Sequence, residues 1–222
     1  MKIPVTKLEL LGTDGTTNVS PARVLSYADI QDHLKLDGSA DQTVVEALID
    51  AATLRLEQFI DRKLVTQHWS IYFDCFPRDY KKDDWWGGAR DGHVSSISSA
   101  DGVIELPFGP CQSVAFINAY DQTDGTTLVA SSAYQVDTMS SLARIAVRLG
   151  SIWPSLTLRP MNGVHVRGVF GIGSASVIPQ DIKQALKITV ASFYEKRGDN
   201  SDPGIPTGAQ NLLEPYRRWK IK

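Results

Sequence analysis

Residues 41–62, DQTVVEALIDAATLRLEQFIDR, carry the clearest periodic pattern in the chain. Apolar side chains recur in this stretch at spacings of three and four, as one face of an amphipathic helix requires. They are Val45, Leu48, Ala52, Leu56, Phe59 and Ile60. Asp41 stands just before the first turn, where a short side-chain oxygen can cap free backbone N–H groups. Arg55, Glu57 and Arg62 lie off the apolar stripe, so we expect them to face solvent or a neighbouring protein.

A second amphipathic stretch, residues 179–197, is the expected partner of this helix. Pro179 stands in the first turn, where proline is favoured. The apolar face of this second helix consists of Ile182, Ala185, Leu186, Thr189, Val190 and Phe193. Two short helices are also predicted: residues 27–35, opened by a capping box of Ser26 and Asp29, and residues 209–214.

The chain between the two long helices has the pattern of β-strands. From Leu64 to Phe73 apolar and polar residues alternate, as in a half-buried strand. Further strand candidates are residues 103–106, 113–120, 133–137, 143–149 and 163–170. Five or six strands at this spacing are typical of a small antiparallel sheet or sandwich.

We therefore predict an α+β fold, in which N- and C-terminal helices form a helical core and an antiparallel β-rich domain is inserted between them. The predicted organisation is an N-terminal arm or hairpin at 1–25, a helical core at 26–63 and 177–216, a β-rich insertion at 64–176, and a C-terminal tail at 217–222.

Charge and composition exclude several classes of protein. A formal net charge of -2 over 222 residues argues against a globally basic nucleic-acid coat. No run of eighteen apolar residues is present for a membrane span, and the first residues, MKIPVTKLELLG, lack the apolar block of a secretory signal. We expect a soluble cytoplasmic product without membrane contact. Cys75 and Cys111 have no close pairing, and we expect both to be buried thiols.

The sequence contains no motif that predicts catalysis. The histidines His33, His68, His93 and His165 are scattered over different elements, and we expect each to be a surface or edge residue. No Gly-x-Ser-x-Gly elbow and no phosphate-binding Gly-Lys-Ser/Thr motif is present. We therefore expect no catalytic residue, no cofactor and no metal.

Two stretches have the composition of contact surfaces. The C-terminal tail interleaves Arg217, Arg218, Lys220 and Lys222 with Tyr216, Trp219 and Ile221. Such a tail holds nucleic acid by charge and stacking, anchors a protein partner, or is merely a frayed terminus. The long loop 77–99 contains Trp85 and Trp86, which either contact a neighbouring protein or pack back onto the sheet.

Several segments follow one another along the chain in a distinctive order. The first are YADIQDHLKLD at 27–37, the helix at 44–60 and DRKLVTQHW at 61–69. The later ones are residues 104–114, 134–137, 153–154, 164–173, 178–186 and 212–218. In this order they are similar to the head-tail connector, or adaptor, proteins of long-tailed bacteriophages and related gene transfer agents. The resemblance therefore covers residues 27–218, whereas the N-terminal arm and the loop 77–99 depart from it.

The resemblance implies a non-enzymatic structural protein of the virion neck, assembled in the host cytoplasm. Adaptors of this kind are usually found as twelve copies in a ring beneath the portal, where they extend the DNA channel and meet the next neck or tail component. The family's C-terminal tail commonly docks onto the portal, which implies portal contacts for Tyr216, Arg217 and Arg218, with Trp219, just beyond the match, as an additional anchor. A slightly acidic subunit suits a channel through which DNA passes without sequence-specific binding.

Three alternatives remain open at this point. A tail-side neck completion protein is the nearest, because β-rich neck proteins also form rings. A sequence-independent nucleic-acid-binding module would use the same tail residues. An enzyme with an unfamiliar site in the β-rich insertion would require a cleft with converging titratable groups.

Overall fold

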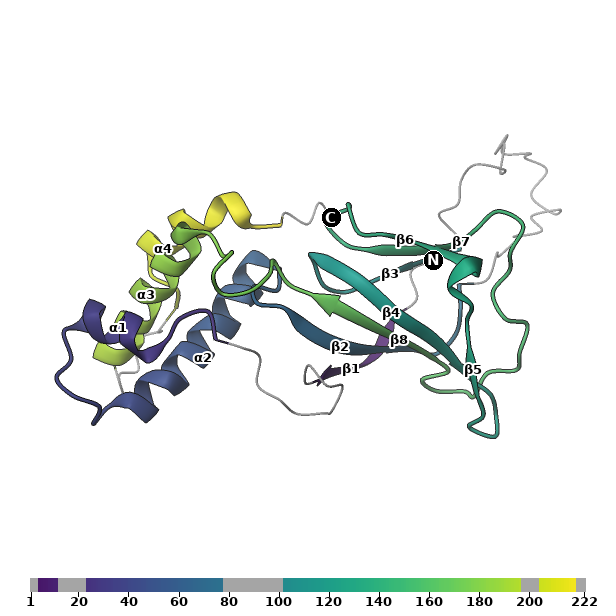
Figure 1. The fold of residues 1–222 in the computed structure, drawn as a ribbon, viewed down its shortest axis with the longest axis horizontal. Helices are drawn as coiled ribbons and strands as arrows, with labels where there is room; N and C mark the ends of the chain where they lie inside the picture. The colour runs from purple at the N-terminus through teal and green to yellow at the C-terminus, as the bar shows by residue number, and fades with distance from the viewer. Residues whose placement is uncertain (1–3, 12–22, 78–101, 197–203, 219–222) are drawn as a thin grey trace. The chain divides into compact units, whose positions relative to one another are not determined.

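The fold is described from a computed structural model of the chain, which defines residues 4–11, 23–77, 102–196 and 204–218. These residues form two compact units. One contains strand β1 (Val5–Leu11) and the described residues of 68–169, and the other contains the described residues of 20–67 and 170–222. Figure 1 shows that the first unit is built from strands and the second from helices.

The helical unit is organised around helix α3. Its elements are α1 (Tyr27–Leu34), α2 (Gln42–Ile60), α3 (Gln180–Glu195), α4 (Thr207–Leu213) and a short 3-10 helix, η2 (Glu214–Tyr216). Helix α3 contacts each of the other three α-helices. The core between them includes the fully buried Ile49, Leu56, Ile182, Leu186 and Leu213. The predicted packing of the two long helices, which are more than a hundred residues apart in the chain, is confirmed.

Of the two predicted helix caps, the structure confirms one and contradicts the other. Ser26 and Asp29 form the predicted capping box of α1. Asp41 is the residue before α2, but its side chain makes no capping bond. Instead the Tyr194 hydroxyl donates to Asp41 Oδ2 at 2.6 Å. The predicted cap is therefore wrong, because a tyrosine at the end of α3 binds this carboxylate.

Glu57 on α2 is buried, which contradicts the expectation that it faces outward. Its side chain is only 4% exposed. One carboxylate oxygen accepts from the Leu64 backbone N–H and from Gln67 Nε2, both at 2.9 Å, and the other from Lys63 Nζ at 2.9 Å. A buried carboxylate is stable only when it is paired in this way. The chain that leaves α2 turns back over the helix and supplies all three donors.

The strands form two sheets in the β-rich unit. The five-stranded sheet has the order β1-β2-β8-β4-β5, and the three-stranded sheet has the order β3-β7-β6. The remaining strands are β2 (Gln67–Phe73), β3 (Val103–Glu105), β4 (Cys111–Tyr120), β5 (Thr126–Leu128), β6 (Tyr134–Asp137), β7 (Arg144–Val147) and β8 (Val164–Phe170), and a 3-10 helix, η1 (Ser131–Ala133), precedes β6. The predicted α+β fold with an antiparallel β-rich part is confirmed.

Alternating burial shows which face of the larger sheet packs into the core. Ile71 and Phe73 of β2, Ile117 of β4, and Val164 and Val166 of β8 are all at most 1% exposed. The intervening residues of these strands point to the other face, because successive side chains in a strand alternate. That other face carries His165 and Ser70, described below.

Two strands were not predicted, and both have weak patterns. Strand β1 lies in the predicted arm and pairs antiparallel with β2, so that Leu8 is opposite Ile71 and Leu10 opposite Trp69. It is an edge strand in which only Leu11 is buried. Strand β5 pairs with β4 and is exposed at all three residues. Edge strands of this kind lack the alternating burial on which the prediction depends.

A glycine allows a close backbone contact where the chain enters and leaves the helical unit. The Ile172 N–H donates to the Leu64 carbonyl at 2.8 Å, and the Thr66 N–H to the Gly173 carbonyl at 2.9 Å. Gly171, the residue before Ile172, has φ +129°, and a Cβ there would lie 2.4 Å from the Val65 carbonyl oxygen. Only glycine fits this position.

Candidate interaction surfaces

His165 is a buried titratable group whose neighbours include a serine hydroxyl, so we considered it for catalysis. It lies on β8, is 8% exposed, and its Nε2 is 2.8 Å from Ser70 Oγ on β2. Its ring stacks on Tyr72 with centroids 4.5 Å apart and meets Phe116 edge-on at 5.2 Å. Burial lowers the pKa of His165 to about 4, so the imidazole is neutral at pH 7. The expectation of a surface or edge histidine is therefore wrong for this residue.

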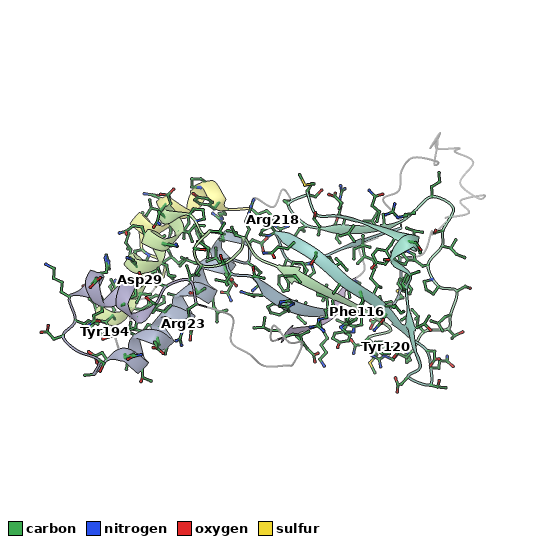
Figure 2. All side chains as sticks on the ribbon, in the orientation of Figure 1. Arg23, Asp29, Phe116, Tyr120, Tyr194 and Arg218 are labelled. Carbon is green, nitrogen blue, oxygen red and sulfur yellow. The ribbon has the colours of Figure 1, made fainter. Side chains whose placement is uncertain are left out.

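The His165–Ser70 pair has the residue types of a nucleophile and its base, but not the accessibility. Ser70 is only 2% exposed. Its partner His165 is enclosed by an aromatic cluster of Tyr72, Phe116 and Tyr120, of which Figure 2 labels Phe116 and Tyr120 on β4. A nucleophile must reach its substrate within hydrogen-bonding distance of the base. The cluster is therefore a packing feature of the sheet.

A cleft in the β-rich unit has a volume of about 1070 Å³. It is lined by residues 74–77, Gly102 and 146–160. Its charged side chains bind the surrounding loops: Asp74 accepts from the Asn162 N–H at 2.9 Å, and Arg148 Nε donates to the Tyr134 carbonyl at 2.9 Å. Within the described residues, no group of three or more His, Cys, Asp or Glu side chains is placed to hold a metal ion.

The two cysteines differ in their environments. Cys111 is buried, as predicted, and burial raises the pKa of its thiol to about 11. Cys75 is exposed, so the expectation that it is buried is wrong. It follows β2 by two residues and lies on the wall of the large cleft.

The structure places three of the predicted contact residues against the helical unit itself. The Arg218 N–H donates to the Ile60 carbonyl at 3.0 Å, and its guanidinium forms an ion pair with Asp61. Asp61 ends α2 in the left-handed conformation, with φ 55°. Because the Arg218 side chain is only 13% exposed, the start of the tail is attached to the end of α2. Figure 2 labels Arg218, which belongs to the helical unit.

Tyr216 and Arg217 are attached more loosely. The Tyr216 hydroxyl donates to Asp181 Oδ2 at 3.2 Å, and Arg217 lies over the Phe59 ring at 4.7 Å. Arg217 also pairs with Glu214 at 3.7 Å, in a solvent-exposed position. Trp219, Trp85 and Trp86, the other predicted contact residues, lie outside the described residues.

Exposed apolar side chains form a set of candidate contacts that the sequence analysis missed. In the helical unit these are Val44 and Leu54 on α2, together with Val177. In the β-rich unit they are Leu8, Leu128, Met139, Leu149, Ile152 and Met161. The α2 residues were detectable from the sequence, because Val44, Ala47, Ala51 and Leu54 follow a second spacing of three, four and three.

None of the helices in the described part of the chain combines the length and apolar character that crossing a membrane requires. No protein-family model matches the chain, and no curated protein matches it.

Solved structures do share the fold. A chain from the neck of an empty gene transfer agent (GTA) particle, computed with C6 symmetry, matches with a TM-score of 0.72 and 21% identity, over 98% of both chains. A chain from the virion of the native GTA particle matches with a TM-score of 0.70 and 22% identity over the same share. A third, from the neck of the native particle computed with C12 symmetry, matches with a TM-score of 0.69, 21% identity and the same coverage. The fold expected from the resemblance to connector proteins is thus confirmed.

Proposed function

We propose that this chain is a structural component of the neck of a phage-like particle, where it acts as a head-tail connector. The observation that carries this proposal is the fold shared with a chain of a GTA particle neck, at a TM-score of 0.72 over 98% of both chains. Coverage of this extent includes both the helical and the β-rich unit. The sequence resemblance to connector proteins supports the same role independently.

The connector forms a ring, with twelve copies as the proposed number. Support comes from the similar neck chain whose particle was computed with C12 symmetry. A closed ring requires two different faces on each copy that meet head to tail. Exposed apolar residues on both units, such as Leu54 and Leu149, are available to form part of such faces.

The ring links the portal to the next neck or tail component. The C-terminal tail contacts the portal through Tyr216, Arg217, Arg218 and Trp219. The attachment of Arg218 to Asp61 supports this proposal, because it holds Arg218, the residue before Trp219, at the end of α2. Trp85 and Trp86 contact a neighbouring protein in the assembled neck.

The ring also extends the channel through which DNA passes. A net charge of -2 favours a conduit, since a strongly basic lining would hold the phosphates in transit. Arg217 and Arg218 are engaged by Glu214 and Asp61, which makes these cations less available to phosphate. The fold shared with GTA particle chains supports a structural, non-enzymatic role.

The proposal is tested by making phage-like particles with and without this chain. Particles that contain it should have intact necks, in which electron microscopy resolves the two units of each copy as a ring between head and tail. Cells lacking the chain should yield heads and tails that are not joined. Normal, infective particles without the chain would refute the proposal, and a ring located on the tail side of another connector would identify a tail-side completion protein instead.

A further inference from the structure

Helix α2 has a second apolar face that the fold does not use. Val44, Ala47, Ala51 and Leu54, here called the outer stripe, are all exposed, with Val44 at 42% and Leu54 at 53%. At 100° per residue these positions lie on the side of the helix opposite the buried Val45, Ile49, Ala52, Leu56 and Ile60. Their spacing of three, four and three is that of the a and d positions of a heptad.

Helix α3, in the same unit, has a polar solvent-facing side. Its exposed positions are all polar, namely Gln180, Asp181, Gln184 and Glu195. Among the exposed positions of α2, by contrast, Arg55 is the single charged residue. A helix that is apolar on two sides is normally covered on two sides. The outer stripe therefore has the composition of an interface.

We propose that the outer stripe packs against a second copy of this chain in the neck ring. This inference rests on the proposed function and names the surface that the ring uses. In a closed ring every copy meets two identical neighbours, so the faces that join copies are present on every subunit. Charged side chains of both signs flank the stripe, with Arg55 on one side and the Arg23–Asp50 pair on the other, so a second copy does not meet a surface of one charge.

The shape of the stripe fits the close approach of a neighbouring helix. Ala47 and Ala51 at its centre have small side chains, and Val44 and Leu54 at its ends are larger. The stripe extends over about 15 Å of helix, from a rise of 1.5 Å per residue. This is too short for an independent coiled coil, which needs three or four heptads. One contact is therefore weak, and the ring is held by many such contacts formed together.

A matched pair of substitutions tests the surface. Ala51→Glu places a charge in the middle of the outer stripe, and Ala28→Glu places the same charge at an exposed alanine of α1. Both positions are exposed, so both variants should unfold within a few degrees of the unmodified chain, measured by circular dichroism. We expect Ala51→Glu to reduce the number of chains per purified particle at least tenfold and Ala28→Glu to leave it unchanged. Equal incorporation of the two folded variants would overturn the proposal.

Site-specific photocrosslinking identifies the occupant of the stripe. Ala51→Cys, in a chain that also carries Cys75→Ser, is labelled with a benzophenone maleimide and incorporated into particles; Ala28→Cys is the control. Irradiation should join Ala51→Cys to a second copy, giving twice the mass of the chain. A crosslink to a different protein, or none beyond the control, would overturn the inference while the neck assignment stands. Absence of the unmodified chain from particles would refute the proposed function itself.

Discussion

At the scale of single residues, burial of His165 makes the stability of the β-rich unit depend on pH. Its pKa is lowered to about 4 in the folded chain, mainly by burial, against 6.5 for an exposed histidine. Between these values the unfolded chain binds the proton more strongly than the folded chain does. The stabilising effect is therefore complete above pH 6.5 and is lost as the pH falls towards 4.

We predict that His165→Gln loses less stability on acidification than the unmodified chain does. From the two pKa values, His165 should account for about 3 kcal/mol of the loss between pH 7 and pH 4. Urea unfolding at both pH values measures this difference. His33→Gln, at an exposed position on α1, is the control and should follow the unmodified chain. Parallel pH profiles for all three proteins would contradict the assignment.

Arg218 leads to a second residue-scale prediction. Its guanidinium is largely buried against Asp61, so Arg218→Ala should lower the free energy of unfolding by about 1 kcal/mol, the value expected for a partly shielded charged hydrogen bond. Arg62→Ala is a matched control, because no ion pair to Arg62 is present among the described residues, and it should change stability by less than half as much. Equal effects of the two substitutions would show that the pair with Asp61 contributes nothing.

At this scale, contacts between residues close in the sequence could be predicted, but contacts between residues far apart in the sequence could not. The capping box of Ser26 and Asp29 involves neighbours three residues apart, and it is present as predicted. Asp41 binds Tyr194, which is 153 residues away, and no local pattern contains that information. His165 was misjudged for the same reason, because Ser70 and Tyr72 cover it from another strand.

At the scale of elements, Glu57 joins the end of α2 to the chain that leads into β2. We predict that Glu57→Ala destabilises the helical unit by about 3 kcal/mol, because it removes the carboxylate that accepts from the buried Leu64 N–H and pairs with the largely buried Lys63. Thermal unfolding followed by circular dichroism at 222 nm measures the effect.

Two further variants separate the loss of the Glu57 hydrogen bonds from the effect of alanine on helix propensity. Glu46→Ala removes a carboxylate from the same helix at a partly exposed position, where it binds Arg23 and Gln42, and should destabilise the unit much less than Glu57→Ala does. Glu57→Gln keeps one acceptor for the Leu64 N–H and should lie between the two alanine variants. A Glu57→Ala protein as stable as Glu46→Ala would mean that water replaces the carboxylate without loss.

Periodicity explains which elements the sequence predicted. Helices α2 and α3 and strands β2, β4 and β8 are long and have one buried face, so their patterns are strong. Strands β1 and β5 are edges with little burial and were missed. The division of the strands into two sheets depends on which strand pairs with which, and this information is not contained in the pattern of any single strand.

At the scale of the whole molecule, the predicted contact residues have two different roles. Tyr216 and Arg218 bind Asp181 and Asp61 of the helical unit, so they contribute to the fold as well as to any partner surface. The sequence indicated their aromatic and basic composition correctly, but it gave no reason to expect these internal partners. The outer stripe of α2 was present in the same sequence and was overlooked, because one apolar face had already explained the helix.

This distinction leads to the last prediction, on how the tail attaches the ring to the portal. Deleting residues 216–222 should both lower the stability of the helical unit and abolish binding to the portal. Replacing only residues 219–222 with serine should leave the unfolding transition unchanged, because the bonds of Arg218 to Asp61 and of Tyr216 to Asp181 remain, and should still weaken portal binding at least tenfold. Unfolding is measured in urea, and portal binding by co-sedimentation at equal salt. If the serine variant binds the portal as the unmodified chain does, residues after Arg218 are not the anchor. If the deletion leaves stability unchanged, the contacts of Tyr216 and Arg218 do not hold the tail in solution.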